Sequence, residues 1–259
     1  MGISLMFRSI LLTLLLLPTM ASASVSYGVF NFGDMKYEEE KNTQEVRSIA
    51  SITKLFTAQT IIDSGVSLEE SVKVRGKSNG RFARGVMIER YELLRAMLMS
   101  SDNLAAESLA HAHPGGYEQF LKDVNDKIGD MGLRNTVIVD STGLLPGNKS
   151  TVDDLKEFLF TMRKYTIIQK LSVEKLYTYE YQNNKRVVRV NFKNTNPQLW
   201  NYDEIILTKT GFTNPAGRCL AMLVEKNGQL YALVTLGNKN IEQRSRTIAG
   251  MFNQHIQTK

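Results

Sequence analysis

The sequence predicts a mixed α/β (α+β) fold in which an antiparallel sheet is flanked by helices and an all-helical segment is inserted after the first strand. Residues 25–32 are β-branched and aromatic, which predicts a strand, and helical patterns follow it. Three short apolar stretches separated by turn sequences then predict an antiparallel meander. Since no repeat or Pro/Gly/Ser-rich linker divides the chain after residue 24, we expect one domain.

The first residues are organised differently from the rest. Arg8 precedes an apolar stretch at residues 10–17, Pro18 breaks it, and residues 21–23 (Ala-Ser-Ala) have the small side chains that a signal peptidase reads. This order predicts a cleavable signal peptide, residues 1–23, and export from the cytoplasm. A buried N-terminal helix is one alternative. A retained membrane anchor is another, but the apolar stretch is well short of the ~20 residues that span a bilayer, so we expect no stable anchor after cleavage.

The helices have recognisable starts and stops. Residues 51–64 carry enough apolar side chains for a mostly buried helix, which Gly65 ends. Thr151 and Asp154 are typical of an N-cap and its accompanying acid. Further helices are predicted at residues 88–99, 102–112, 117–130, 151–164 and 241–255.

The C-terminal strands are predicted at residues 205–210, 220–226 and 230–236. Residues 214–217 (Asn-Pro-Ala-Gly) separate the first two strands. Asn227-Gly228 separates the last two, and this dipeptide is a strong signal for a hairpin.

Composition excludes several classes of protein. A charged fraction of 22% excludes a largely disordered chain, and the single cysteine, Cys219, excludes a disulfide framework or a cysteine-based metal centre. We expect Cys219 to be buried and unreactive. The net charge of +6 is modest and does not indicate a nucleic-acid partner. His111 and His113 are two positions apart and do not share a helix face, so we expect no metal site.

Two tetrapeptides have the pattern S-x-x-K, and their surroundings differ. Ser51 and Lys54 lie one turn apart at the start of the most apolar predicted helix, near a helix end that favours negative charge. An N-cap role for Ser51 is the alternative, but that role needs no lysine. Ser172 and Lys175 have no such helix behind them, and we expect a turn there.

Two tripeptides complete a known signature. Ser101-Asp102-Asn103 falls at the break between two predicted helices, where Ser101 is also an N-cap candidate. Lys209-Thr210-Gly211 falls at a predicted strand end, where a solvated lysine and a turn glycine are the alternative. The order S-x-x-K, S-x-N and K-T-G is similar to the signature of class A β-lactamases and penicillin-binding proteins.

The resemblance extends beyond these motifs. It is carried by RSIASITKLFTA (47–58), LMSSDNLAAESLAH (98–111), PGGYEQF (114–120), STGL (141–144) and LTKTGFTNPAGRCL (207–220). These stretches resemble the low-molecular-mass penicillin-binding proteins, and most closely their D-alanyl-D-alanine endopeptidase branch. The resemblance implies a β-lactamase/transpeptidase-like fold with the site between the sheet and an all-helical subdomain. It also implies a single catalytic domain at residues 24–259 without the C-terminal β-domain of many carboxypeptidase relatives.

The resemblance implies catalytic roles for four side chains. Ser51 is expected to be the nucleophile that forms an acyl-enzyme, and Lys54, in its neutral form, the base. Ser101 is expected to relay a proton to the leaving nitrogen, and Asn103 to bind the substrate backbone and orient Lys54. A neutral Lys54 requires burial and nearby positive charge, which Lys209 is expected to supply.

The resemblance also implies how substrate binds. Lys209 and Thr210 are expected to hold the acyl-donor strand or a carboxylate, with Gly211 allowing close backbone approach. The backbone N–H groups of Ser51 and Phe212 are expected to form the oxyanion hole.

The sequence leaves open the role of one arginine and the choice among several functions. Arg244 matches a carboxylate-contacting arginine of relatives, but Arg246 is close by, and a solvated helix face is an equal alternative. The favoured function is a periplasmic serine D,D-endopeptidase that cuts D-alanyl–diaminopimelyl cross-links of peptidoglycan, is acylated by β-lactam antibiotics and needs no metal or organic cofactor. A D-alanyl-D-alanine carboxypeptidase is the first alternative. A serine β-lactamase is disfavoured because its E-x-x-L-N pattern is absent, and a non-catalytic wall-binding protein because all three motifs are intact.

Overall fold

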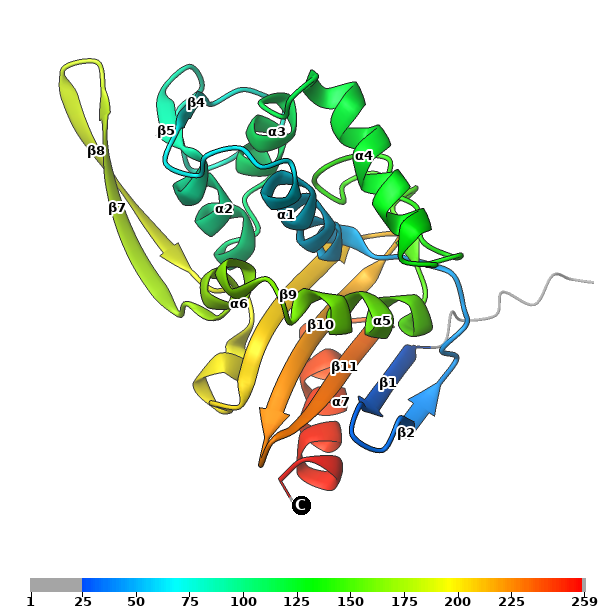
Figure 1. Ribbon diagram of the computed structural model, residues 1–259. Coiled ribbons are helices and arrows are strands. Elements are labelled where there is room, and N and C mark those ends of the chain that lie inside the picture. Colours follow the sequence, from blue (N-terminus) through cyan, green and yellow to red (C-terminus); the bar gives the residue numbers. More distant parts are fainter. Residues whose placement is uncertain (1–24, 258–259) are drawn as a thin grey trace, which may run out of the picture.

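The computed structural model describes residues 25–257, so the predicted signal peptide lies outside the described residues. Its centre is a five-stranded antiparallel sheet of order β2-β1-β11-β10-β9. The strands are β1 (Ser26–Asn31), β2 (Lys36–Lys41), β9 (Ile205–Thr213), β10 (Gly217–Lys226) and β11 (Gln229–Asn238). The first strand, β1, therefore pairs with the last strand, β11, and β9 forms one edge of the sheet (Figure 1).

Helices cover both faces of this sheet (Figure 1). Helix α7 (Ile241–His255) packs on one face, and α5 (Val152–Met162) and α6 (Thr166–Val173) pack on the other. Met222 and Ala221 are neighbours on β10, yet they belong to different hydrophobic cores. Such alternation is what the period of a strand dictates when both faces of a sheet are covered.

The all-helical segment lies beside the α5 face of the sheet (Figure 1). It contains α1 (Thr53–Asp63), α2 (Arg90–Met99), α3 (Asn103–His111) and α4 (Gly116–Asp130). Helix α1 is buried over nearly its whole length, since the other three helices contact it and the 3-10 turn η1 (Ala50–Ile52) joins it to the sheet. Two short strand pairs complete this part: β3 (Arg47–Ser48) with β6 (Lys149–Ser150), and β4 (Ser71–Lys73) with β5 (Met87–Glu89).

Most predicted elements are confirmed. Helix α7 has the predicted bounds, and the Thr151 side chain caps α5 by accepting a hydrogen bond from the Asp154 N–H. Asn227 and Gly228 both have positive φ in the β10–β11 turn. The three C-terminal strands run longer than predicted, because ladder pairing continues through polar residues. Cys219 is fully buried, as expected.

Two expectations about local structure are wrong, and one alternative is excluded. Ser51 lies in the η1 turn, and the α-helix begins two residues later at Thr53. Ser172 lies in helix α6, where it is fully buried, and not in a turn. The cap of α3 is Asp102, whose side chain accepts from the Ala105 N–H, and not Ser101.

A long hairpin was not predicted. Strands β7 (Leu176–Asn183) and β8 (Arg186–Lys193) project from the body beside α2 (Figure 1). Tyr181 packs edge-on against Phe82, with ring centroids 5.6 Å apart, so one face of the hairpin is anchored to the helical segment. The chain continues from β8 through the 3-10 helix η2 (Pro197–Trp200) to β9.

Candidate active site

The η1 turn presents Ser51 at the junction of sheet and helices. Ala50, directly before it, has a φ of +46°, a left-handed conformation that costs energy in a residue with a Cβ. The Ser51 Oγ atom lies 2.8 Å from the Lys54 Nζ atom. The S-x-x-K pair is thus in direct contact, although its first residue precedes the α-helix.

Lys54 is fully buried and has three polar neighbours. Its Nζ atom lies 2.7 Å from Asn103 Oδ1 and 2.6 Å from the Thr142 carbonyl oxygen, in addition to Ser51. Burial lowers the pKa of Lys54 to about 7, while the carboxylates of Asp140 and of Asp102 and Glu107 oppose this shift. Burial, and not a charge on Lys209, is therefore what lowers the pKa of this amine.

The hydrogen-bond geometry fixes what the neutral Lys54 amine does. A neutral amine has two N–H donors and one lone pair. Asn103 Oδ1 and the Thr142 carbonyl only accept, so they take both N–H groups. The lone pair is left facing Ser51, whose hydroxyl can donate to it. The arrangement suits removal of a proton from Ser51.

The second motif lies at the start of α3. Ser101 has a φ of +58°, and Asn103 is the first helical residue. Between them, the carboxylate of Asp102 also accepts from the Arg81 N–H at 2.7 Å. Burial raises the pKa of Asp102, although this hydrogen bond and the one from Ala105 lower it. Asp102 therefore holds the backbone that presents Ser101 and Asn103.

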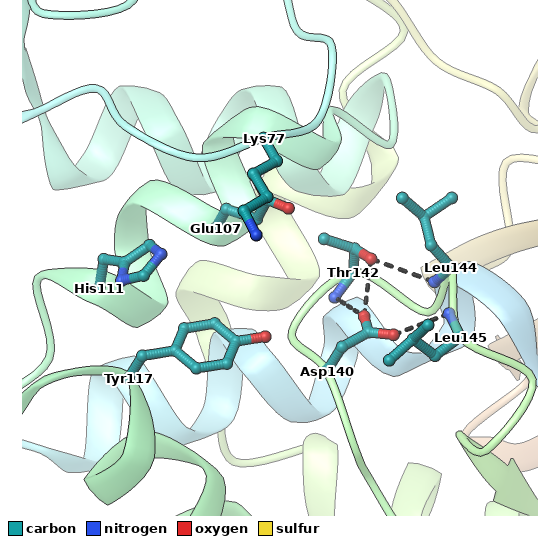
Figure 2. Close-up of a pocket in the computed structure, with 8 residues that line it drawn as sticks. All are labelled: Lys77, Glu107, His111, Tyr117, Asp140, Thr142, Leu144 and Leu145. Carbon is teal, nitrogen blue, oxygen red and sulfur yellow. Dashed lines mark hydrogen bonds between the residues drawn. The ribbon is translucent and has the colours of Figure 1, made fainter.

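A loop organised by Asp140 supplies the Thr142 carbonyl (Figure 2). The Asp140 carboxylate accepts from the N–H groups of Thr142, Gly143 and Leu145 at 2.6–2.8 Å, and from the Thr142 hydroxyl and Asn148 side chain. Burial raises the pKa of Asp140, but these donors outweigh it and lower the pKa overall. The carboxylate is thus committed to shaping the loop.

Two glycines allow the backbone to pack around the Ser51 N–H group. A Cβ on Gly143, whose φ is +83°, would lie 2.0 Å from the Ala50 carbonyl oxygen. A Cβ on Gly211 would lie 3.0 Å from the Ser51 nitrogen and 2.9 Å from the Ile49 carbonyl oxygen. Any side chain at either position would displace the Ser51 backbone.

The open edge of β9 faces this turn. The Thr208 N–H donates to the Ser172 hydroxyl at 3.2 Å, so it points away from β10. The β9–β10 register is continuous from Leu207 to Thr213, and N–H groups in an antiparallel strand alternate in direction. The N–H group of Phe212 therefore points to the same open side as that of Thr208.

The third motif has two differently placed side chains. Lys209 is buried, and its Nζ atom donates to the Thr210 carbonyl oxygen at 2.9 Å. Burial lowers the pKa of Lys209 well below its usual value, and the charges of Lys54 and Arg244 lower it further. The Thr210 hydroxyl lies 2.6 Å from that of Thr195.

A groove of about 400 Å³ runs over Ser51. Its lining residues are Ser51, Ser101, Asn103, Leu144, Thr195, Thr210, Gly211, Phe212, Arg218, Ile241 and Arg244. Arg244 is buried and reaches this groove, whereas Arg246 is exposed. Burial and the neighbouring charge of Arg218 lower the pKa of Arg244. A pair of close cations is an environment suited to a carboxylate.

Several residues of the site were not predicted. Thr142 contributes a backbone carbonyl, which leaves no signal in the sequence, and Asp140 acts only through its loop. Arg218 stands opposite Phe212 in the β9–β10 register, with its guanidinium carbon 3.9 Å from the ring centroid. The turn at residues 214–217 joins β9 to β10, so a correct prediction of this turn would have placed Arg218 opposite Phe212.

A further cavity of about 500 Å³ lies next to the groove, and the two share Leu144 (Figure 2). It is lined by Lys77, Glu107, His111, Tyr117, Asp140, Thr142, Leu144 and Leu145. Ser51 and Lys54 are not among the residues that line it, so this larger cavity is not the place of the serine chemistry. Burial and the charge of Arg75 lower the pKa of His111 at its edge.

Residues 34–240 match the D-alanyl-D-alanine carboxypeptidase family, Peptidase_S11. The chain belongs to this family. It is 38% identical over 230 residues to a D-alanyl-D-alanine endopeptidase of Escherichia coli, across 85% of this chain and 72% of that protein. A D-alanyl-D-alanine endopeptidase of Pseudomonas aeruginosa is also 38% identical over 230 residues, across 84% of this chain and 71% of that protein.

The fold agrees with this membership in the D-alanyl-D-alanine carboxypeptidase family. A DD-transpeptidase of Streptomyces superposes with a TM-score of 0.80 at 23% identity, across 91% of this chain and 97% of that one. The protein is therefore a serine D,D-peptidase of peptidoglycan with a transpeptidase-like mixed α/β fold. Within residues 25–257, no helix is both long and apolar enough to cross a membrane.

Proposed function

We propose that the protein is a D,D-endopeptidase that hydrolyses D-alanyl–diaminopimelyl cross-links, with Ser51 as nucleophile and Lys54 as general base. The observation that carries the proposal is the 2.8 Å contact between Ser51 Oγ and the buried Lys54 amine, whose pKa is about 7. The endopeptidase names of the relatives at 38% identity support the choice of bond.

Acylation begins when Ser51 Oγ attacks the carbonyl carbon of the D-alanyl residue and its proton passes to the Lys54 amine. The new O–C bond makes the carbonyl oxygen an oxyanion, and the N–H groups of Ser51 and Phe212 bind it. Collapse of this intermediate breaks the C–N bond. The proton returns from Lys54 through the Ser101 hydroxyl to the leaving amine, and the D-alanyl ester of Ser51 remains.

Deacylation uses the same base. A water molecule attacks the ester carbonyl carbon and gives its proton to Lys54, and the Ser51 oxygen leaves and recovers that proton. Asp140 does not serve as the base, because five hydrogen bonds already occupy its carboxylate. Lys54 is thus the general base both when the ester forms and when water hydrolyses it.

The groove orients the substrate. An extended peptide pairs with the outward N–H and C=O groups of β9 near Thr210, as an added strand. Arg244 and Thr210, which line the groove, bind a carboxylate on the leaving-group side. Lys209 is buried outside the lining of the groove and supports the strand by donating to the Thr210 carbonyl oxygen. Asn103 bonds the substrate backbone while it holds Lys54.

The choice between endopeptidase and carboxypeptidase is tested with two substrates. Purified protein is incubated with a cross-linked muropeptide dimer and, separately, with a monomeric pentapeptide, and products are measured by mass spectrometry. We expect monomers from the dimer, and no cleavage by Ser51→Ala. Release of D-alanine from the pentapeptide with the dimer intact would make the protein a carboxypeptidase. Rapid nitrocefin turnover would instead indicate a β-lactamase.

We also propose that the enzyme is periplasmic, exported by residues 1–23, and that β-lactams acylate Ser51. The order of charge, apolar stretch and small residues supports export. Fractionation of cells that express the full chain, with a labelled penicillin as the probe, is expected to find the acylated protein in the periplasmic fraction with residues 1–23 removed. Labelled protein that retains residues 1–23 and stays with membranes would contradict the proposal.

A further inference from the structure

A second pocket, of about 430 Å³, adjoins the groove on the side of the β7–β8 hairpin. Its lining residues are Lys193, Asn194, Thr195, Pro197 and Trp200. Lys193 ends β8, and Trp200 ends the 3-10 helix η2 (Pro197–Trp200). Thr195 lines both the pocket and the groove, and its hydroxyl contacts that of Thr210. The pocket is therefore adjacent to the active-site groove, with Thr195 between them.

Trp200 is the only tryptophan of the sequence, and its side chain is 44% exposed. Its support is nevertheless rigid. The Asn196 side chain caps η2 by accepting from the Gln198 N–H, and its amide donates to the Thr208 hydroxyl at 2.8 Å. Leu199 is buried beside it in the α7 core. A large aromatic face held in place at the surface is pre-organised to bind a ligand.

The chemistry of the pocket is that of a saccharide site. The Lys193 ammonium lies 5.6 Å from the centroid of the Trp200 ring, and the Thr195 hydroxyl lines the same space. One face of a pyranose ring carries C–H groups, which pack on the electron-rich face of an indole. Its hydroxyl and N-acetyl oxygens are acceptors for an ammonium and a hydroxyl. A purely apolar ligand would use the indole and leave Lys193 unmatched.

The length of the peptide separates the sugar from the scissile bond. In peptidoglycan the peptide that contains the scissile bond is attached to an amino-sugar strand. An extended peptide spans about 3.3–3.6 Å per residue, so a stem of three or four residues bridges on the order of 10 Å. A sugar at the base of the stem therefore lies beyond the part of the groove that holds the scissile bond.

We infer that the Trp200–Lys193 pocket binds an amino-sugar ring of the glycan strand while the attached peptide occupies the groove over Ser51. The inference rests on the proposed function for the identity of the bound peptide. It adds a glycan subsite, with Trp200 as stacking surface and Lys193 as hydrogen-bond donor.

Binding is tested through the fluorescence of Trp200, which reports on this pocket because the sequence has no other tryptophan. The probe is a peptide-free oligosaccharide of alternating N-acetylglucosamine and N-acetylmuramic acid. We expect a saturable change in emission, weakened several-fold in Lys193→Met. Met87→Ala, at an exposed residue outside the pocket, is expected to bind as wild type. A wild-type protein whose emission does not change saturably would overturn the inference.

Catalysis provides the second readout. We expect Trp200→Ala to raise KM about tenfold for a dimer that retains its sugars, the effect of losing roughly one good stacking contact. KM for the sugar-free peptide dimer and the rate of penicillin acylation are expected to stay unchanged. Equal changes with both dimers, or none, would overturn the glycan site. A wild-type protein that binds the oligosaccharide but cuts neither dimer would overturn the endopeptidase proposal and leave the glycan site supported.

Discussion

The two S-x-x-K sequences of this chain adopt different structures with different uses. At the first, the Ser51 hydroxyl contacts a fully buried Lys54. At the second, Ser172 is buried in α6, where its hydroxyl donates to the Gln169 carbonyl at 2.9 Å and accepts from the Thr208 N–H at 3.2 Å. Lys175 is exposed and pairs with a surface carboxylate.

The difference lies in what surrounds each lysine. Burial of Lys54 lowers the pKa of its amine to about 7. Two neighbouring oxygens only accept hydrogen bonds, so the lone pair of the neutral amine faces the Ser51 hydroxyl. Lys175 lies in water, where an ammonium is well solvated. Identical residues at identical spacing therefore have different surroundings, and only at the first sequence is the amine desolvated, as the proposed role of Lys54 as a base requires.

Loss of Ser51, the serine of the first S-x-x-K sequence, is expected to have the largest effect. Ser51→Ala removes the proposed nucleophile, so labelling by a fluorescent penicillin is expected to disappear in a gel assay. Ser172→Ala, the matched change in the second sequence, is expected to retain labelling. Labelling that persists in Ser51→Ala would assign the nucleophile to another residue.

Loss of Lys54, the lysine of the first S-x-x-K sequence, is expected to have the second-largest effect. Lys54→Met keeps much of the buried volume but removes the proposed base, and we expect the acylation rate to fall by a factor of about 10²–10⁴. Lys175→Met is expected to acylate at the wild-type rate, since its lysine is exposed. Stopped-flow measurement of penicillin acylation compares the two variants, and a similar loss in both would remove the distinction between the motifs.

The pH profile is expected to report the same amine. The pKa of Lys54 is about 7 in place of the usual 10.5, so below pH 7 the protonated form prevails and has no lone pair. The acylation rate should therefore fall about tenfold per pH unit below 7 and level off above it. The unfolded lysine binds a proton up to higher pH, so this residue also makes stability rise between these two values. A flat profile from pH 5 to 8 would contradict a Lys54 base.

The smallest expected effect is on stability, and it concerns Ser172, the serine of the second S-x-x-K sequence. Ser172→Ala leaves the buried Thr208 N–H without its acceptor, which costs about 1–3 kcal/mol of unfolding free energy. Ser71→Ala, at an exposed position, is expected to change it by less than about 0.5 kcal/mol. Urea unfolding measures both, and equal values would mean that Ser172 has no structural role.

The helices and the C-terminal meander were predictable because their signals are local. Thr151, the pattern of residues 241–255 and Asn227-Gly228 each specify a cap, a helix face or a turn within a few positions. The bounds of β9 were not predictable in the same way, since a strand extends as far as its partner allows. The β7–β8 hairpin depends on Phe82, nearly a hundred positions away from Tyr181.

The residues of the site also fall into two groups, those with a local sequence signal and those that depend on distant parts of the chain. Ser51 and Lys54 share a local spacing, so their contact was predictable. The carbonyl of Thr142 and the carboxylate of Asp140 act through a loop that folds back on Ser51 from a distant part of the chain. Sequence patterns do not register such contacts, because any residue offers a carbonyl group.

The exposed edge of β9 has a consequence for how the molecule avoids self-association. Unpaired strand edges invite added strands from other chains, and proteins usually block them. Here Ser172 occupies the Thr208 N–H, and the η1 turn packs against the strand near Gly211. Between these two contacts, only the backbone near Lys209 and Thr210 is left for an added strand. The short length of this segment limits edge-to-edge pairing with other chains.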